Sequence, residues 1–95
     1  MAIDYRSQSP QILADFLSYH ETIKAHSQRT VDEYFLDLRN FFRYVKQLRD
    51  PALRDTPFDQ IGIMDVDLSL IKTITLSDIY GYMTYLSRDR VQHQN

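Results

Sequence analysis

The sequence predicts an all-α fold, a small helical bundle built as one domain. Three segments carry apolar residues at helical spacing, and only two glycines and three prolines interrupt the 95 residues. A sandwich or barrel would need many more turn residues. The length is that of a single domain, and the hydrophobic fraction of 43% is enough for a packed core.

The composition excludes several classes of protein. The chain has no cysteine, which removes a disulfide scaffold, a thiolate zinc site and a cysteine nucleophile and fits the reducing cytoplasm. No apolar run approaches the roughly 18 residues that span a bilayer, and the N-terminus lacks the apolar core of a signal peptide. We therefore expect a cytoplasmic protein with no membrane partner. The net charge is −2, so nucleic acid must bind, if at all, at a local basic patch.

The first predicted helix covers residues 10–25. Ser9 is a good N-cap, and Pro10 suits the first helical position because a proline has no N–H to leave unpaired there. The apolar residues near one face are Ile12, Leu13, Phe16, Leu17 and Ile23. Polar residues take the other side, so this helix is expected to pack by one face.

The second predicted helix, residues 28–49, has the clearest pattern in the chain. Its apolar residues recur at helical spacing along one arc: Val31, Tyr34, Phe35, Leu38, Phe41, Phe42, Val45 and Leu48. Ser27 is the expected N-cap, and Asp50 before Pro51 ends the helix, since proline disfavours helix in the residue before it. Such an aromatic face must pack on other helices.

Residues 50–74 are expected to be irregular, with a short helical turn capped by Asp67. A third long helix then begins at Thr75, where Thr75 and Asp78 form a capping box with aspartate in place of glutamate. Its expected apolar face contains Leu76, Ile79, Tyr80, Met83 and Leu86. The alternations at residues 61–63 and 71–74 are too short to form a sheet without partners.

The charge is unevenly distributed along the chain. Residues 24–54 hold seven Lys and Arg against four Asp and Glu, a net +3, whereas residues 55–78 hold one against five, a net −4. Arg39, Arg43 and Lys46 fall within about 60° of one another on the helical wheel. They form a basic stripe, which is either a solvated face or a face that follows DNA phosphates.

No residue pattern predicts catalysis, a metal site or a cofactor. His26 and Arg29 match H-x-x-R, but this short match spans a loop and a helix start. His20 has no second ligand four residues later, where Lys24 stands. The aspartates of residues 55–67 lack the spacing of a calcium loop and are expected to cap helices. Tyrosines on or beside the apolar faces are expected to pack in the core: Tyr34, Tyr44 and Tyr80.

Two stretches together resemble a known family. Residues 27–45 match S-x-x-T-x-x-x-Y-x-x-D-L-R-x-F-x-x-[FY]-[LV], and residues 74–86 match I-T-x-x-D-I-x-x-[FY]-x-x-x-L. They are similar to segments of the N-terminal, SAM-like core-binding domain of tyrosine recombinases, the phage integrases and Xer-type recombinases. The resemblance covers residues 9–90. It implies a small helical bundle that clamps duplex DNA during integration or recombination, with other recombinase protomers as further partners.

The resemblance also implies what to expect outside these residues. The family's catalytic arginine, lysine, H-x-x-R box and tyrosine nucleophile lie in a separate domain. Residues 1–95 are therefore expected to be the core-binding domain only, with no catalytic residue of their own. The family usually continues into another long helix after residues 88–92, so the bundle is expected to lack its last helix. Apolar surface left uncovered would favour self-association.

Both the resemblance and the charge pattern indicate that the second predicted helix binds DNA. Free amides and the helix dipole attract phosphate at its N-terminus, and the resemblance implies that this N-terminus faces the DNA major groove. The expected DNA-binding residues are Ser27, Gln28, Arg29, Thr30, Glu33, Arg39, Arg43 and Lys46. For Arg39 and Arg43 the alternatives are contacts to the DNA backbone or intramolecular pairs. The competing function is an all-α protein–protein interaction module, since exposed aromatic residues would also suit a partner helix.

Overall fold

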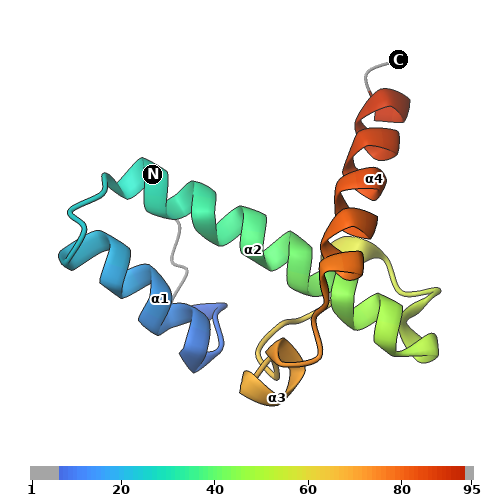
Figure 1. The fold of residues 1–95 in the computed structure, drawn as a ribbon, viewed down its shortest axis with the longest axis horizontal. Helices are drawn as coiled ribbons and strands as arrows, with labels where there is room; N and C mark the ends of the chain where they lie inside the picture. The colour runs from blue at the N-terminus through green and yellow to red at the C-terminus, as the bar shows by residue number, and fades with distance from the viewer. Residues whose placement is uncertain (1–6, 94–95) are drawn as a thin grey trace.

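The structure, a computed structural model, describes residues 7–93 and the side chains of residues 7–88. Over that range it has four α-helices, two 3-10 turns and no strand, which confirms the all-α prediction. The elements are α1 (Gln11–Thr22), α2 (Gln28–Arg49), η2 (Pro51–Leu53), η3 (Phe58–Gln60), α3 (Leu68–Ile71) and α4 (Leu76–His93). α1 and α2 form a hairpin, and α4 crosses the C-terminal half of α2 and projects away from the other helices (Figure 1).

Helix α2 begins and ends at the predicted residues. Ser27 Oγ accepts a hydrogen bond from Thr30 N at 3.2 Å, which satisfies one of the free amides of the first turn. At the other end the Asp50 carboxylate accepts from Ala52 N at 3.0 Å and starts η2. The apolar face between these ends supplies more of the core than any other element, with Val31, Phe35, Phe42 and Val45 buried. Leu13 and Leu17 of α1 pack into the same core.

Helix α1 is shorter than predicted at both ends. The expected cap at Ser9 is wrong: Pro10 occupies the N-cap position without a side-chain cap, and Ser9 Oγ is buried with no hydrogen-bond partner. The helix ends at Thr22, because the chain turns back and Ala25 takes a positive φ of 55°. That turn brings the chain to Ser27 and sets the direction of α2.

A loop completes the core, which the sequence pattern did not predict. Ile61, Ile63 and Val66 are each only 2–3% exposed, although no regular element contains them. Ile63 and Val66 belong to the same hydrophobic cluster as the buried residues of α1 and α2. The buried isoleucines are the two apolar positions of the short alternation at residues 61–63, so the alternation marks an extended segment that lies on helices rather than in a sheet.

The capping box of α4 is confirmed in both directions. Thr75 N donates to Asp78 Oδ2 at 2.9 Å, and Asp78 N donates to Thr75 Oγ1 at 3.2 Å. The helix has its first residue at Leu76, as expected for a box that begins at Thr75. Asp67 also caps α3 as predicted, since its Oδ1 accepts from Leu70 N at 2.9 Å.

The predicted apolar face of α4 is wrong in its orientation. Exposed fractions of 41–62% are found at Leu76, Ile79, Tyr80 and Met83. The core position predicted for Tyr80 is therefore wrong as well. The face that packs on α2 instead carries Gly81, Tyr82 and Tyr85.

Aromatic rings and one glycine explain this orientation. The Tyr82 ring lies 5.2 Å from the Phe41 ring, and Tyr44 of α2 lies 5.3 Å from Tyr82 and 5.5 Å from Tyr85. A Cβ at Gly81 would lie only 2.7 Å from Tyr44 Oη, so the glycine allows the close approach of the two helices. Ring packing thus outweighs burial of the smaller aliphatic side chains.

The same substitution at two leucines tests this assignment of the core. Leu17 is fully buried and Leu76 is 62% exposed. We expect Leu17→Ala to lower the free energy of unfolding by about 2–5 kcal/mol, because it removes buried methyl groups and leaves a cavity. Leu76→Ala is expected to change it by less than about 0.5 kcal/mol. Urea denaturation followed by circular dichroism measures both, and equal effects would contradict the assignment.

Candidate nucleic-acid interface

The N-terminal turns of α2 bring together the first five predicted site residues. Gln28 Nε2 donates to Asp32 Oδ1 at 2.8 Å, and Ser27 Oγ, the cap, donates to Thr30 Oγ1 at 3.1 Å. The amides of the first helical turn have no acceptor within the helix. Such free amides and the helix dipole together attract a phosphate or another anion.

Arg29 is the most accessible cation of this turn. Its Nε lies 3.4 Å from Glu33 Oε1, and the two side chains are 89% and 61% exposed. An exposed pair one helical turn apart contributes little to stability, so Arg29 can leave Glu33 at small cost. The guanidinium is thus available to a partner in solution.

The basic stripe further along α2 makes intramolecular contacts. Arg43 Nε donates to Ile61 O at 2.9 Å and Arg43 Nη2 to Asp59 O at 3.1 Å. Lys46 Nζ donates to Gly62 O and lies 2.6 Å from Asp65 Oδ1. Both cations therefore donate hydrogen bonds to backbone carbonyls of the loop that completes the core. In a sheet, the backbone amides of a neighbouring strand would donate these hydrogen bonds.

The electrostatics of the stripe agree with this arrangement. Partial burial lowers the pKa of the Arg43 guanidinium, and the nearby charge of Arg39 lowers it further. The hydrogen bond from Lys46 holds the pKa of Asp65 below its usual value. The Arg39 guanidinium lies over the Phe35 ring, 5.3 Å from its centroid, and its Nη1 donates to Gln8 at 3.2 Å.

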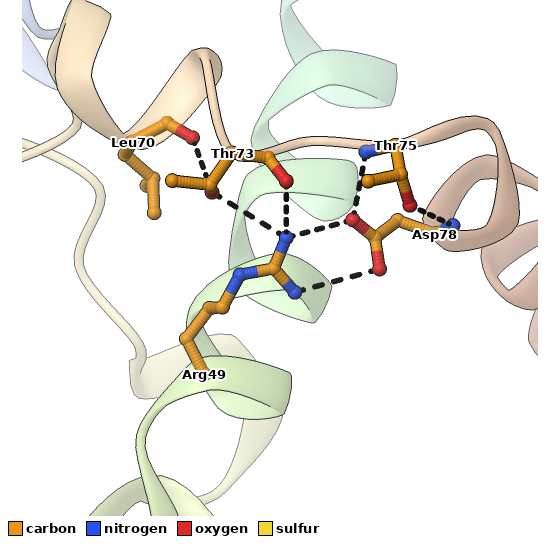
Figure 2. Close-up of polar contacts among 5 residues, drawn as sticks. All are labelled: Arg49, Leu70, Thr73, Thr75 and Asp78. Carbon is orange, nitrogen blue, oxygen red and sulfur yellow. Dashed lines mark hydrogen bonds and ion pairs between the residues drawn. The ribbon is translucent and has the colours of Figure 1, made fainter.

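Arg49, one turn beyond the stripe, joins α2 to the start of α4 by hydrogen bonds and an ion pair (Figure 2). Its Nη2 donates to Asp78 Oδ2 at 2.7 Å and to Thr73 O at 3.0 Å, while its Nη1 reaches Asp78 Oδ1 at 3.4 Å. Asp78 is the same residue that closes the capping box with Thr75. The Arg49 hydrogen bond, with that of the Thr75 amide, lowers the pKa of Asp78 to about 2. Arg49 was not among the predicted site residues; its position three residues after Lys46 was the available signal.

The predicted site residues therefore divide into two groups. Ser27, Gln28, Arg29, Thr30 and Glu33 lie on the first turns of α2, which face solvent apart from the half-buried Thr30. The second group lies nearer the middle and far end of the helix and has partners within the chain: Arg39, Arg43 and Lys46. The intramolecular alternative is thus observed for both arginines. A DNA contact by this second group stays a prediction.

The part of the chain that the structure describes shows neither a metal site nor a membrane-spanning helix. In residues 7–88 no three His, Cys, Asp or Glu side chains are grouped so that they would hold a metal ion. None of the described helices combines the length and apolarity required to cross a membrane.

The chain belongs to the tyrosine recombinase family. It is 43% identical over 81 residues to tyrosine recombinase XerC of Caldanaerobacter subterraneus subsp. tengcongensis. The aligned segment is 85% of this chain but only 23% of that protein, so the chain spans about a quarter of the length of its curated relative. No protein-family model and no solved structure matched the chain.

The Arg49–Asp78 contact predicts a specific response to acid. The pKa of Asp78 falls from 3.8 to about 2 on folding, so its carboxylate stabilises the fold above about pH 4, and this contribution is lost as the pH falls towards 2. We expect Asp78→Asn to be less stable than the wild type at neutral pH and to lose less stability than the wild type over this acid range. Melting temperatures measured from pH 7 to about pH 2 test this.

Asp55→Asn, at an exposed loop position, is the matched control for the loss of one carboxylate. Its melting temperatures are expected to follow those of the wild type at each pH. If Asp78→Asn also followed the wild type, the contact of Arg49 with Asp78 would not stabilise the fold.

Proposed function

We propose that this chain is the core-binding domain of a site-specific tyrosine recombinase and that it positions the enzyme on duplex DNA for integration or recombination. In this proposal residues 1–95 carry the DNA-binding part, the chemistry belongs to a separate catalytic domain of the parent protein, and the protein acts in the cytoplasm. The related XerC protein is named a tyrosine recombinase and is more than four times as long as the aligned segment, which supports this division.

The exposed N-terminal turn of α2 is the observation that carries the proposal. Arg29 is 89% exposed there, beside amides that lack helical acceptors. Most of the affinity of a protein for DNA comes from contacts to phosphate, which arginines and helix N-termini both make. Arg43 and Lys46 have partners within the chain, so we assign the first DNA contacts to residues 27–33.

Removing the Arg29 charge tests this assignment. We expect the chain to bind duplex DNA with an affinity that falls steeply between about 50 and 200 mM salt. Arg29→Ala should weaken binding and reduce the slope of log K against log salt by about 0.9, because one phosphate contact is lost. Fluorescence anisotropy of a labelled duplex of mixed sequence, titrated at several salt concentrations, measures both quantities.

Arg54→Ala is the matched control, since it removes the same charge from an exposed position beyond the C-terminal end of α2. We expect its salt slope to equal that of the wild type. Equal slopes for wild type and Arg29→Ala would contradict the placement of the interface, and binding that does not respond to salt would contradict the function.

A second proposal concerns the uncovered apolar surface. Leu76, Ile79, Tyr80 and Met83 are exposed on one side of α4. A hollow of about 170 Å³ also opens between α1, α2 and α3, lined by Ile12, Leu13, Phe16, Leu38, Phe42 and Ile71. Large exposed apolar patches usually mark a contact surface. We propose that further helical chain of the parent recombinase covers this surface, and the alternative is a partner protein.

The chain by itself is then expected to associate through this surface. We expect its mass by light scattering to rise above that of a monomer as the concentration increases. Met83→Glu should shift the mass back towards the monomer, because it places a charge among the exposed apolar residues, whereas Ser87→Glu, one turn later on α4, should have less effect. A monomeric mass for the wild type at high concentration would contradict this expectation.

A further inference from the structure

Two histidine rings stack on each other where α1 joins α2. His20 lies in the last turn of α1, and His26 lies in the connecting loop, directly before the cap Ser27. The ring centroids are 5.4 Å apart with an angle of 20° between the planes. The residue that precedes the N-terminal turn of α2 is therefore in contact with the body of α1.

The backbone of the loop is shaped to make this stack. Ile23 N and Lys24 N both donate to Tyr19 O, the second across five residues, so the last turn widens as the helix ends. Ala25 then takes a φ of 55°, a conformation that residues with a side chain adopt rarely. His26 N donates to His20 O at 3.0 Å, which returns the chain to the helix and places one ring over the other.

The two rings differ in how firmly they are held. His20 is surrounded by Phe16 at 4.4 Å and Tyr19 at 5.4 Å, and Tyr34 of α2 meets it edge-on at 5.3 Å. Its Nδ1 is buried without a hydrogen-bond partner, so aromatic packing fixes this ring. His26 is exposed and touches only the outer side of this group, with Tyr34 edge-on at 5.9 Å.

We propose that His26 is a positioning residue for the DNA-contacting turn of α2, and that it acts by stacking on His20. The proposal rests on the function proposed above. Only Ser27 and Gln28 separate His26 from Arg29, and Ser27 is the cap that starts the helix. A loop held at His26 therefore fixes where the first amides of α2 and the Arg29 guanidinium lie relative to the bundle.

Two substitutions separate stacking from a direct DNA contact. At neutral pH we expect His26→Ala to weaken binding about two- to tenfold, the value of one aromatic pair, and His26→Phe to restore it, because phenylalanine can stack on His20 but cannot contact a phosphate. Tyr80→Ala, which removes an exposed ring of α4, is the control for a lost aromatic side chain and should bind as the wild type does. Fluorescence anisotropy with a duplex of mixed sequence provides the affinities.

The phenylalanine variant decides between positioning and a direct phosphate contact. If His26→Phe bound as weakly as His26→Ala, the proposal would be overturned, because the imidazole itself would then contact the phosphate. Equal affinity of His26→Ala and wild type at neutral pH would also overturn it.

Hydrogen exchange of the chain without DNA tests the positioning separately from the function. The amides of His26 and Thr30, which donate to His20 O and to Ser27 Oγ, should exchange faster in His26→Ala and at the wild-type rate in His26→Phe. Unchanged exchange in His26→Ala would overturn the positioning role even if the chain binds DNA. If exchange changes as expected but the wild type binds no DNA, the proposed function fails while the role of His26 in fixing the turn stands.

Discussion

The fold depends on a row of cations along α2 that bind parts of the chain having no regular structure. Arg43 and Lys46 donate to the carbonyls of residues 59, 61 and 62, and Arg49 donates to the segment between α3 and α4. The loop contacted by Arg43 and Lys46 buries the side chains of Ile61, Ile63 and Val66 outside any sheet. Backbone carbonyls that no sheet pairs need other donors, and here side chains of a neighbouring helix supply them.

Because these cations have partners within the chain, the uneven charge of the sequence is only partly evidence for a DNA-binding surface. Part of the positive charge of residues 24–54 pairs with the negative charge of residues 55–78 within the chain. Lys46 pairs with Asp65, and Arg49 pairs with Asp78. Periodicity on a helical wheel shows which residues share a face but not what covers that face. Arg29, the accessible cation of the N-terminal turn, lies in the same region of charge but at the other end of the helix.

The sequence predicted the parts of the fold that local physics decides. The ends of α2, the cap at Asp67 and the capping box of Thr75 with Asp78 depend on residues within a few positions of one another. Two of the failures depend on distant partners. The face of α4 that packs was decided by rings on α2 and η3, and the loop entered the core because α2 carries donors for its carbonyls.

The candidate site follows the same division. The turn at residues 27–33 was predictable because a cap, an arginine and exposed polar residues are all local features. The stack of His26 on His20 was not, because it needs the reversal at Ala25, and alanine is not a residue whose presence indicates a positive φ.

The crossing of α2 and α4 links two positions that are far apart in the sequence. A Cβ at position 81 would meet Tyr44 Oη at 2.7 Å, but the next nearest atom of that ring, Cζ, is 3.8 Å away, an ordinary contact. A side chain at position 81 therefore requires the Tyr44 hydroxyl to move or to be absent. Among related sequences, a side chain at position 81 should occur together with a residue other than tyrosine at position 44, so these two positions should vary as a pair.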